Sequence, residues 1–395
     1  MSQKTCVAGV GMIPFTKPGA SPTYIAMGAE ATRLALKDAG LDYRLVQQAY
    51  VGYVYGDSTC GQSALYEVGV SGIPIVNVNN NCSTGSSALF LARQAVESGA
   101  VECALALGFE QMQPGALGSN WSDRPEAMGK HLDIAAQLNA DATSVPMALK
   151  LFGGAGREHM NTYGTRLETF AAIRAKASRH AANNPLALFR KVLTTDDVMN
   201  DPVVWPGVMT RSMACPPTCG AAAAIICSEA FAKKQGLRTD VVVLAQSMTT
   251  DAALSFEPKS MIQVVGFDMA QRAAGQVYEQ AGVGPQDIRV VELHDCFAHN
   301  ELLTYESLGL CPVGEAERFV MDGDNSYGGR VVTNPSGGLL SKGHPLGATG
   351  LAQCYELTRQ LRGTAGFTQV EGVNLALQHN LGLGGSCVVT LYGRN

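Results

Sequence analysis

The chain has 395 residues, a length that predicts two or three domains rather than one core. Hydrophobic residues make up 46% of the sequence and charged residues 16%, which excludes a disordered chain and favours a large, deeply buried, oligomeric α/β enzyme. The formal net charge is −5, and no Lys/Arg block is long enough to follow a nucleic-acid backbone, so no nucleic-acid partner is predicted.

The cysteine usage indicates a reducing compartment. The chain has 11 cysteines, an odd number with irregular spacing, and this is not a disulfide framework. The pair in "CPPTC" (215–219) is separated by three residues and has no second pair, which argues against a metal or redox motif. The start "MSQKTCVAGVGM" is not a signal peptide, and no apolar run reaches membrane-spanning length.

The first part of the chain alternates predicted strands and helices, as in a layered α/β domain. A helix over 23–40 has helical periodicity and stops at Gly40. A second helix follows the turn at Cys82 and runs to Gly99. The predicted strands are 4–15, 47–57, 73–79 and 101–112.

From about 113 to 212 the sequence becomes polar and irregular and predicts short helices, so we interpret it as an insertion. The small-residue strand "CGAAAAIICSE" (219–229) then returns to the first domain. The predicted division is a first half of 1–112 and 213–235, an inserted domain of 113–212, and a second half of 236–395. The second half repeats the βαβα alternation, a weak repeat at the level of sequence, with strands at 240–249, 288–296, 372–380 and 384–393 and helices at 267–282, 297–309 and 343–363.

Cys82 lies in "VNVNNNCSTGSSALF", where a strand gives way to a helix. Unpaired N–H groups and the positive end of the helix dipole are expected to favour the thiolate, and the turn is expected to expose the side chain. Cys82 is therefore a candidate nucleophile. A buried structural cysteine is the alternative, and this segment alone does not decide between them.

Two histidines are candidate acid/base groups. His344 in "SKGHPLGATG" precedes a helix and is read either as a base for the thiol or as a helix cap. His294 in "VVELHDCFAHNEL" ends an apolar strand, where α/β active sites form. Cys296 is expected on the same side of that strand and would add a second thiol. The glycines of "LQHNLGLGGS" (377–386) either form a structural turn or aim backbone N–H groups at an oxyanion.

These blocks together resemble the thiolase superfamily, and specifically thiolases of the sterol carrier protein 2 (SCP2) type. The matching blocks are "NNNCSTGSSAL" around Cys82, "HDCF" (294–297), "GHP" (343–345) and "QHNLGLGG" (378–385), in family order. The resemblance covers essentially the whole chain. It implies an α/β thiolase fold of five layers, α-β-α-β-α, with two similar halves and an inserted loop domain. It also implies a homodimer or homotetramer built on the N-terminal halves.

The resemblance implies the roles of the candidate residues. Cys82 would attack C3 of a 3-oxoacyl-CoA, with His344 as its base, and Cys296 would protonate the departing enolate. His294 and His344 would donate to the enolate oxygen. The backbone N–H groups of Cys82 and of Leu381 or Gly382 would hold the oxygen at C3. His379, Asn380 and Leu381 stand where other thiolases carry a second catalytic cysteine, so Cys296 is expected to replace it.

The expected reaction is cleavage of 3-oxoacyl-CoA by CoA to acetyl- or propionyl-CoA and a shortened acyl-CoA, in the β-oxidation of fatty, branched-chain or sterol side-chain substrates. CoA is a co-substrate, and neither a permanent cofactor nor a metal is expected. The insertion carries basic residues that either neutralise CoA phosphates or form a solvated helix face: Arg174, Lys176, Arg179 and His180.

Three alternatives remain at the level of sequence. A retro-aldol lyase of steroid side-chain CoA thioesters is expected to lack an intact pair of thiols. A non-catalytic acyl-CoA or sterol binding protein would not need the catalytic blocks, and a ketosynthase-like condensing enzyme would lack Cys296. The ending "VVTLYGRN" has no S-K-L-like signal, which favours a cytoplasmic, bacterial-type enzyme. A peroxisomal location is the alternative if the sequence is part of a longer protein.

Overall fold

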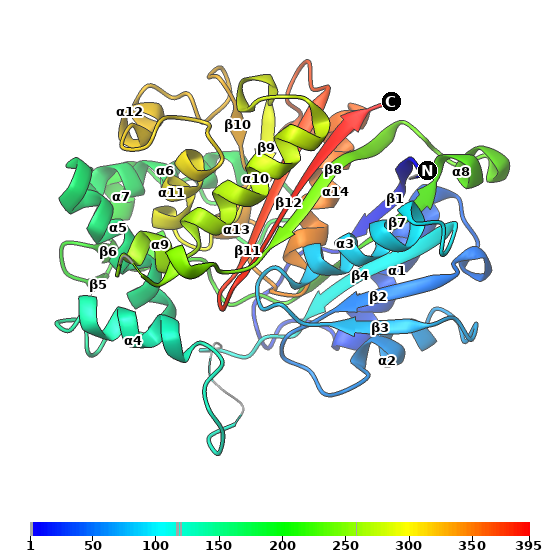
Figure 1. The fold of residues 1–395 in the computed structure, drawn as a ribbon, viewed down its shortest axis with the longest axis horizontal. Helices are drawn as coiled ribbons and strands as arrows, with labels where there is room; N and C mark the ends of the chain where they lie inside the picture. Colours follow the sequence, from blue (N-terminus) through cyan, green and yellow to red (C-terminus); the bar gives the residue numbers. More distant parts are fainter. Residues whose placement is uncertain (1–2, 116–117, 119–120, 258) are drawn as a thin grey trace.

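The computed structural model describes residues 3–115, 118, 121–257 and 259–395 (Figure 1). Ten strands form one hydrogen-bonded order that divides into two sets of five. The first set is β1 (Thr5–Met12), β2 (Gln48–Gly52), β3 (Ile75–Val78), β4 (Cys103–Glu110) and β7 (Gly220–Ser228). The second set is β8 (Val241–Thr249), β9 (Val290–Glu292), β10 (Val332–Thr333), β11 (Leu375–Gly382) and β12 (Ser386–Arg394).

The two sets have the same topology. The order is β3-β2-β4-β7-β1 in the first and β10-β9-β11-β12-β8 in the second. In both, the first two pairings are parallel and the last two are antiparallel. The sets meet where β1 pairs with β8 through Cys6 and Val242. The alternation suggested by the sequence is therefore a repeat of strand order and direction.

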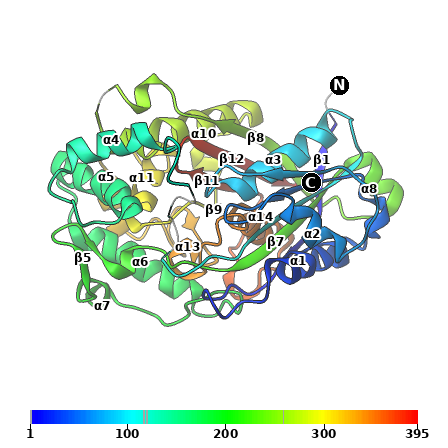
Figure 2. The same cartoon turned by 90° about the horizontal axis from the view of Figure 1, so that it is seen from below.

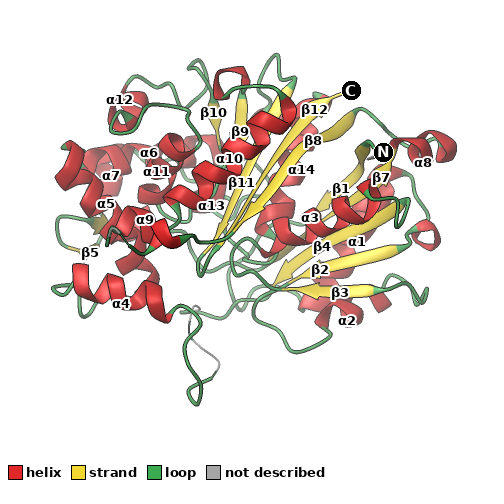
Figure 3. Cartoon of the chain, in the orientation of Figure 1, coloured by secondary structure: helices red, strands yellow, loops and turns green. Residues whose placement is uncertain are grey.

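Helices form three layers against the two sets of strands, which makes five layers in all (Figures 1 and 3). Helices α1 (Tyr24–Ala39) and α2 (Cys60–Tyr66) contact the first set, and α10 (Phe267–Ala281) packs on β8 and β12 of the second. Helices α3 (Thr84–Glu97) and α14 (Thr349–Arg362) contact each other and strands of both sets, so they form the central layer. This arrangement confirms the predicted five-layered α/β architecture.

The helix ends agree with the sequence signals. Helix α1 ends at Gly40 with φ 68°, and α10 ends at Gly282 with φ 67°, both in the left-handed region that glycine adopts at little cost. A short helix, α8 (Glu229–Gln235), follows β7 and ends in the same way at Gly236.

The segment between β4 and β7 forms a helical body beside the strands (Figure 2). The prediction of an irregular segment with short helices is wrong here, because α5 has 17 residues and α6 has 15. Their buried faces share one core with helix α11 (Ala298–Ser307) of the second half. The other elements of this segment are α4 (Gly129–Leu138), α5 (Met147–Tyr163), α6 (Leu167–Ala181), α7 (Thr195–Met199), β5 (Val203–Trp205) and β6 (Met209–Thr210).

Strand β9 is shorter than predicted. It ends at Glu292, so His294 and Cys296 do not lie on one side of a continuing strand. They belong to a loop that leads into α11. The second half also contains the short helices α9 (Met261–Val264), α12 (Ala316–Met321) and α13 (Gly338–Ser341). Of the helices in the described part of the chain, none combines the length and apolar character needed to span a bilayer.

Candidate active site

Cys82 lies in the turn between β3 and α3. Asn81 adopts φ 52°, a left-handed conformation that asparagine tolerates, and its side chain donates to Leu383 O at 3.1 Å. Helix α3 begins at Thr84, whose hydroxyl donates to Asn81 O. The expectation of an exposed thiol is wrong, because only 7% of the Cys82 surface is accessible. The turn is fixed on both sides of the cysteine.

Backbone N–H groups at the start of the helix favour the thiolate, as expected, but burial outweighs them in the resting site. Burial raises the pKa of the Cys82 thiol to about 12, and the charge of the Glu110 carboxyl acts in the same direction. Backbone N–H groups of Leu383 and of Cys82 itself oppose this shift but do not outweigh it. Removal of a thiolate from water costs more than these peptide dipoles return. Cys82 therefore rests as a neutral thiol.

His344 lies between α13 and α14 and is buried. Its backbone N–H donates to Thr218 Oγ1 at 3.1 Å, and its Nδ1 lies 2.7 Å from Thr349 Oγ1. The Thr349 hydroxyl donates its own proton to Pro345 O, so it must accept from Nδ1–H of His344. Nε2 is therefore the unprotonated nitrogen, and it has no protein partner among the described residues. Burial lowers the pKa of His344 to about 3, so the ring is a neutral acceptor.

His294 lies 3.0 Å through its Nδ1 from Nδ2 of Asn380 on β11. The same amide nitrogen donates to Cys82 O at 3.1 Å. An amide NH₂ only donates, so Nδ1 of His294 accepts and the ring proton sits on Nε2. Burial lowers the pKa of His294 well below its ordinary value, helped by the neighbouring His344 and His379 rings. His294 is therefore a neutral donor beside a neutral acceptor.

These three side chains converge. The Cys82 sulfur and one ring nitrogen each of His294 and His344 lie within 4.8 Å of one another. The centroids of the two imidazole rings are 5.0 Å apart, in an edge-to-face arrangement. Such a set is close enough to share a metal ion. However, metal-bound histidines usually donate their other ring N–H to an acceptor, whereas Nδ1 of His294 accepts from Asn380. The surroundings suit proton transfer better, and the absence of a metal stays a prediction.

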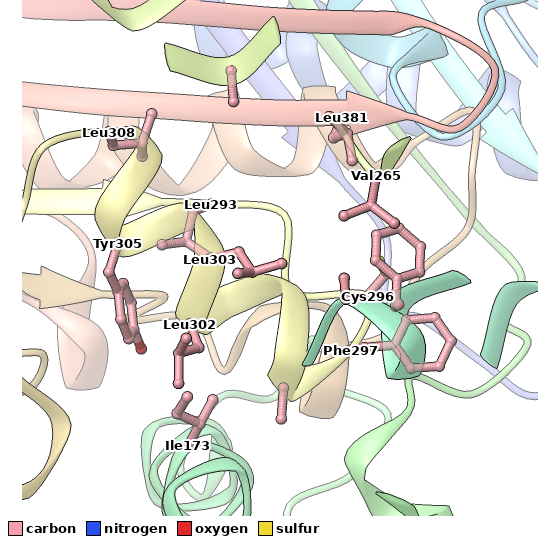
Figure 4. Packing of buried hydrophobic residues seen from close by; sticks show 14 of the residues in the cluster. Ile173, Val265, Leu293, Cys296, Phe297, Leu302, Leu303, Tyr305, Leu308 and Leu381 are labelled. Carbon is pink, nitrogen blue, oxygen red and sulfur yellow. The ribbon is translucent and has the colours of Figure 1, made fainter. Parts of the chain in front are cut away.

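Cys296 joins the site from the loop after β9 and is buried at one end of the largest apolar cluster (Figure 4). Its neighbour in space is Cys215, which sequence reasoning missed. Ala214 pairs with Phe297 in an antiparallel bridge, and Cys215 N–H donates to Cys296 O at 2.9 Å. Residues opposite each other in such a pair share one face, so the two thiols lie side by side.

Both thiols are held in the neutral form. Burial raises the pKa of Cys296 well above its ordinary value, and the neighbouring Cys215 and Cys82 act in the same direction. Burial and the neighbouring Cys82 likewise raise the pKa of Cys215. The three thiols of Cys82, Cys215 and Cys296 are therefore neighbours. The Cys219 sulfur donates to Met112 O at 3.4 Å, and the absence of a metal or redox role for the "CPPTC" pair stays a prediction.

Leu381 and Gly382, the predicted backbone donors, end β11 beside the Cys82 turn. A Cβ on Gly382 would lie 2.2 Å from Asn80 O, so glycine allows the strand to approach the turn this closely. The next residue, Leu383, supplies the N–H that lowers the pKa of Cys82. Leu383 is thus a further candidate donor that the sequence left unnamed.

Glu110 at the end of β4 was also missed. Its carboxylate accepts from Val54 N at 3.0 Å, Tyr55 N at 2.9 Å and Gly347 N at 3.0 Å. Gly347 follows His344 by three residues, so Glu110 ties the loop after β2 to the histidine loop. Burial raises the pKa of Glu110 to about 7.

The basic cluster of α6 is neither a phosphate patch nor a solvated face, because Arg174, Lys176 and His180 are buried. Lys176 pairs with Glu301 of α11, and Arg174 donates to Ser341 Oγ at 2.7 Å. His180 contacts Asn334 O and Ser326 Oγ. Only Arg179 is exposed. Helix α6 is buried on nearly all sides, and its buried polar side chains bond to residues of the second half.

Comparison with known proteins agrees with this geometry. The model of the thiolase N-terminal domain matches residues 5–230, and that of the thiolase C-terminal domain-like family matches residues 253–393. The chain belongs to the thiolase family, in its SCP2 type. It is 56% identical to sterol carrier protein 2 of Oryctolagus cuniculus over 391 residues, 98% of this chain and 71% of that protein. This thiolase is an acyltransferase enzyme.

Two further likenesses extend this comparison. The thiolase is 34% identical to the benzoylsuccinyl-CoA thiolase subunit BbsB of Thauera aromatica, over 97% of this chain and 96% of that protein. A solved structure described as an Ltp2-ChsH2(DUF35) aldolase superposes with a TM-score of 0.83 at 22% identity, covering 100% of this chain and 98% of that one. At that identity the second likeness shows the fold alone.

Proposed function

We propose that this thiolase cleaves 3-oxoacyl-CoA with CoA, through an acyl group carried on Cys82. The observation that carries the proposal is the convergence of the Cys82 sulfur with one ring nitrogen each of His294 and His344 within 4.8 Å, in a buried site where Nε2 of His344 has no partner among the described residues. A second buried thiol, Cys296, lies near enough to Cys82 for the two to interact electrostatically. A nucleophile needs a base within reach, and cleavage of a carbon–carbon bond needs a separate acid for the departing carbanion. This site offers both.

The proton bookkeeping follows from the neutral resting state. Cys82 gives its proton to Nε2 of His344 as its sulfur bonds to C3 of the substrate. The Cα–Cβ bond then breaks, and the electron pair leaves as the enolate of acetyl- or propionyl-CoA. Cys296 protonates Cα of that enolate. CoA next gives its thiol proton back to Cys296, attacks the acyl group, and releases Cys82, which recovers its proton from His344.

Two donor sets stabilise the charge in this scheme. His294 donates from Nε2 to the enolate oxygen, and His344 joins it only after it has taken the Cys82 proton. The oxygen at C3 accepts from the N–H of Cys82 and from the β11 turn, where Leu381, Gly382 and Leu383 are the candidates. Loss of one such donor typically lowers the rate by roughly 10²–10³.

Straight-chain, 2-methyl-branched and steroid side-chain thioesters are all compatible with this chemistry. The names of relatives support both an acyl-CoA and a sterol-related substrate. The alternative is a retro-aldol lyase of steroid side-chain CoA thioesters, which would need neither thiol. A non-catalytic acyl-CoA or sterol binding protein is the other alternative.

We also propose that the thiolase is a homodimer or homotetramer in a reducing compartment. β3 is at an edge of the strand order, and its apolar residue Val76 is 40% exposed. Cytoplasm is the proposed location, with the peroxisome as the alternative. Light scattering of the purified protein tests the oligomeric state.

The test is CoA-dependent loss of acetoacetyl-CoA and of a 2-methyl-3-oxoacyl-CoA, followed by absorbance of the 3-oxo thioester. The variants are Cys82→Ala and Cys296→Ala, with Cys227→Ala as the control. Cys227 is also a buried cysteine, and it lies on β7 opposite Cys6 of β1. We expect activity in the wild type and the control and a loss of at least roughly 10³ in both site variants.

A wild type that binds these thioesters without cleaving them would overturn the proposal. CoA-independent cleavage of a 3-hydroxyacyl thioester that survives Cys82→Ala would favour the lyase instead. Ping-pong kinetics with a trapped acyl group on Cys82 are expected if the covalent scheme is right.

A further inference from the structure

A buried chain of polar side chains runs from β12 to His294. Tyr392 OH donates to Gln378 Oε1 at 2.5 Å, and Gln378 Nε2 donates to Ser86 Oγ at 2.8 Å. Ser86 Oγ donates to Asn380 Oδ1 at 2.8 Å. Asn380 Nδ2 then meets Nδ1 of His294. All five residues are at most 1% exposed, so each polar atom must find its partner inside the protein.

The direction of this chain is fixed at its far end. Gln378 Oε1 accepts from Tyr392, so its NH₂ group faces Gly350 O at 2.7 Å and Ser86 Oγ. Ser86 therefore accepts from Gln378 and has one proton left, which goes to Asn380 Oδ1. That contact sets the Asn380 amide with its nitrogen toward Cys82 O and His294. In a flipped Asn380 amide, the NH₂ group would face the Ser86 hydroxyl proton and the amide oxygen would face the unprotonated Nδ1 of His294.

We propose that Asn380, oriented by Ser86 and Gln378, is a positioning residue that holds His294 as the Nε2–H tautomer. This inference rests on the proposed thiolase function. No acceptor among the described protein residues takes the Nε2 proton, so it stays available for the substrate. Asn380 also holds Cys82 O, and thus links the nucleophile turn to the enolate donor.

The tautomer matters for only one half of the reaction. Breaking the Cα–Cβ bond develops charge on the enolate oxygen, where His294 donates. Exchange of an acyl group between CoA and Cys82 develops charge only on the thioester carbonyl held by backbone N–H groups. A defect in the His294 tautomer must therefore slow carbon–carbon cleavage far more than acyl exchange.

The experiment compares Asn380→Asp with the wild type. A carboxylate accepts where the amide donated, so it moves the His294 proton to Nδ1 and leaves Nε2 bare. We expect acetoacetyl-CoA cleavage to fall roughly 10²–10³-fold. Exchange of labelled CoA into acetyl-CoA should fall less than roughly tenfold. Nitrogen NMR of the histidine rings, with His294 assigned from a His294→Asn spectrum, should show the protonated nitrogen change from Nε2 to Nδ1.

Ser86→Ala provides a second variant that adds no charge. It removes the proton that orients Asn380, and it should lower the ratio of cleavage to exchange in the same direction but by less. Ser83→Ala is the matched control: Ser83 is equally buried, three residues earlier at the start of α3, but its hydroxyl bonds Asn80 O and Ser386. Its ratio of cleavage to exchange should equal that of the wild type.

The inference is overturned if cleavage and exchange fall together in Asn380→Asp and Ser86→Ala, or if the His294 tautomer is unchanged in Asn380→Asp. Failure of the underlying function looks different, because the wild type itself would then exchange label without cleaving the 3-oxo thioester.

Discussion

The resting protonation of Cys82 gives the sharpest prediction. A thiol with the pKa of about 12 set by burial has roughly one molecule in 10⁵ ionised at pH 7, against about one in 30 for a free thiol. Alkylation by iodoacetamide requires the thiolate. We therefore expect Cys82 to react roughly 10³-fold more slowly than free cysteine at pH 7.

The dependence on pH is as informative as the rate. Because the pKa lies above the accessible range, the alkylation rate should rise about tenfold per pH unit from pH 6 to 10 without a plateau. The assay is mass spectrometry of the peptide that contains Cys82, with glutathione alkylated in the same buffer as the reference. Reading that peptide alone keeps the other cysteines out of the measurement.

A preformed thiolate–imidazolium pair would behave differently. It would give a plateau across neutral pH, and removal of His344 would then lower the rate steeply. In the neutral site, His344→Ala should leave the pH slope of Cys82 alkylation unchanged, although it abolishes turnover. A plateau below pH 8, or loss of neutral-pH reactivity in His344→Ala, refutes the reasoning from burial.

Three further predictions concern the stability of the fold: a matched pair of glycine substitutions, a buried ion pair and a buried carboxyl group. Gly108→Ala places a Cβ 2.1 Å from Gly347 O, backbone against backbone, and should cost at least about 1–3 kcal/mol in urea unfolding. Gly275 lies on the exposed face of α10 with nothing within 4 Å of its would-be Cβ, so Gly275→Ala should instead stabilise the fold by about 0.5–1 kcal/mol. Lys176→Met leaves the Glu301 charge unpaired in the core and should lower the free energy of unfolding by about 3–5 kcal/mol. The double variant Lys176→Met/Glu301→Leu should recover part of this loss, and equal losses in both variants would contradict the reasoning. Glu110 has a pKa of about 7 when folded and 4.5 when free, so the folded state holds more protons between these values and the free energy of unfolding should fall as pH rises through that window. The slope due to Glu110 is at most about 1.4 kcal/mol per pH unit, measured as wild type minus Glu110→Gln in urea at pH 5, 6 and 7.

The sequence predicted the parts of the fold that depend on local signals. Apolar periodicity and glycine stops located α1 and α10 to within a residue or two, and the strand–helix joint located the Cys82 turn. Predictions that depended on solvent failed. The thiol was expected to be exposed and ionised because the sequence shows a helix terminus but not the surroundings that bury it.

Contacts between distant segments were also beyond the sequence. Ser86 and Asn380 are separated by 294 positions, and Cys215 meets Cys296 across a bridge between two loops. One signal was present for the first pair: Gln378 and Asn380 are two residues apart, and so on one face of a strand, within a polar run of three residues (378–380) that has apolar residues before it. Polar side chains on one buried face of a strand require partners, and so predict a network without saying where it leads.

The repeated topology explains why these residues meet. The turn of Cys82 lies between β3 and the central helix α3, and the loop of His344 lies between β10 and the central helix α14, so base and nucleophile hold equivalent places in the two halves. Gly85 of α3 packs on the start of α14, where a Cβ added to it would lie 2.6 Å from O of the preceding Gly347 and 3.1 Å from Gly350 N. A side chain in place of this glycine would push the two halves apart and separate Cys82 from His344. The packing of the two halves therefore sets the distance between the base His344 and the nucleophile Cys82.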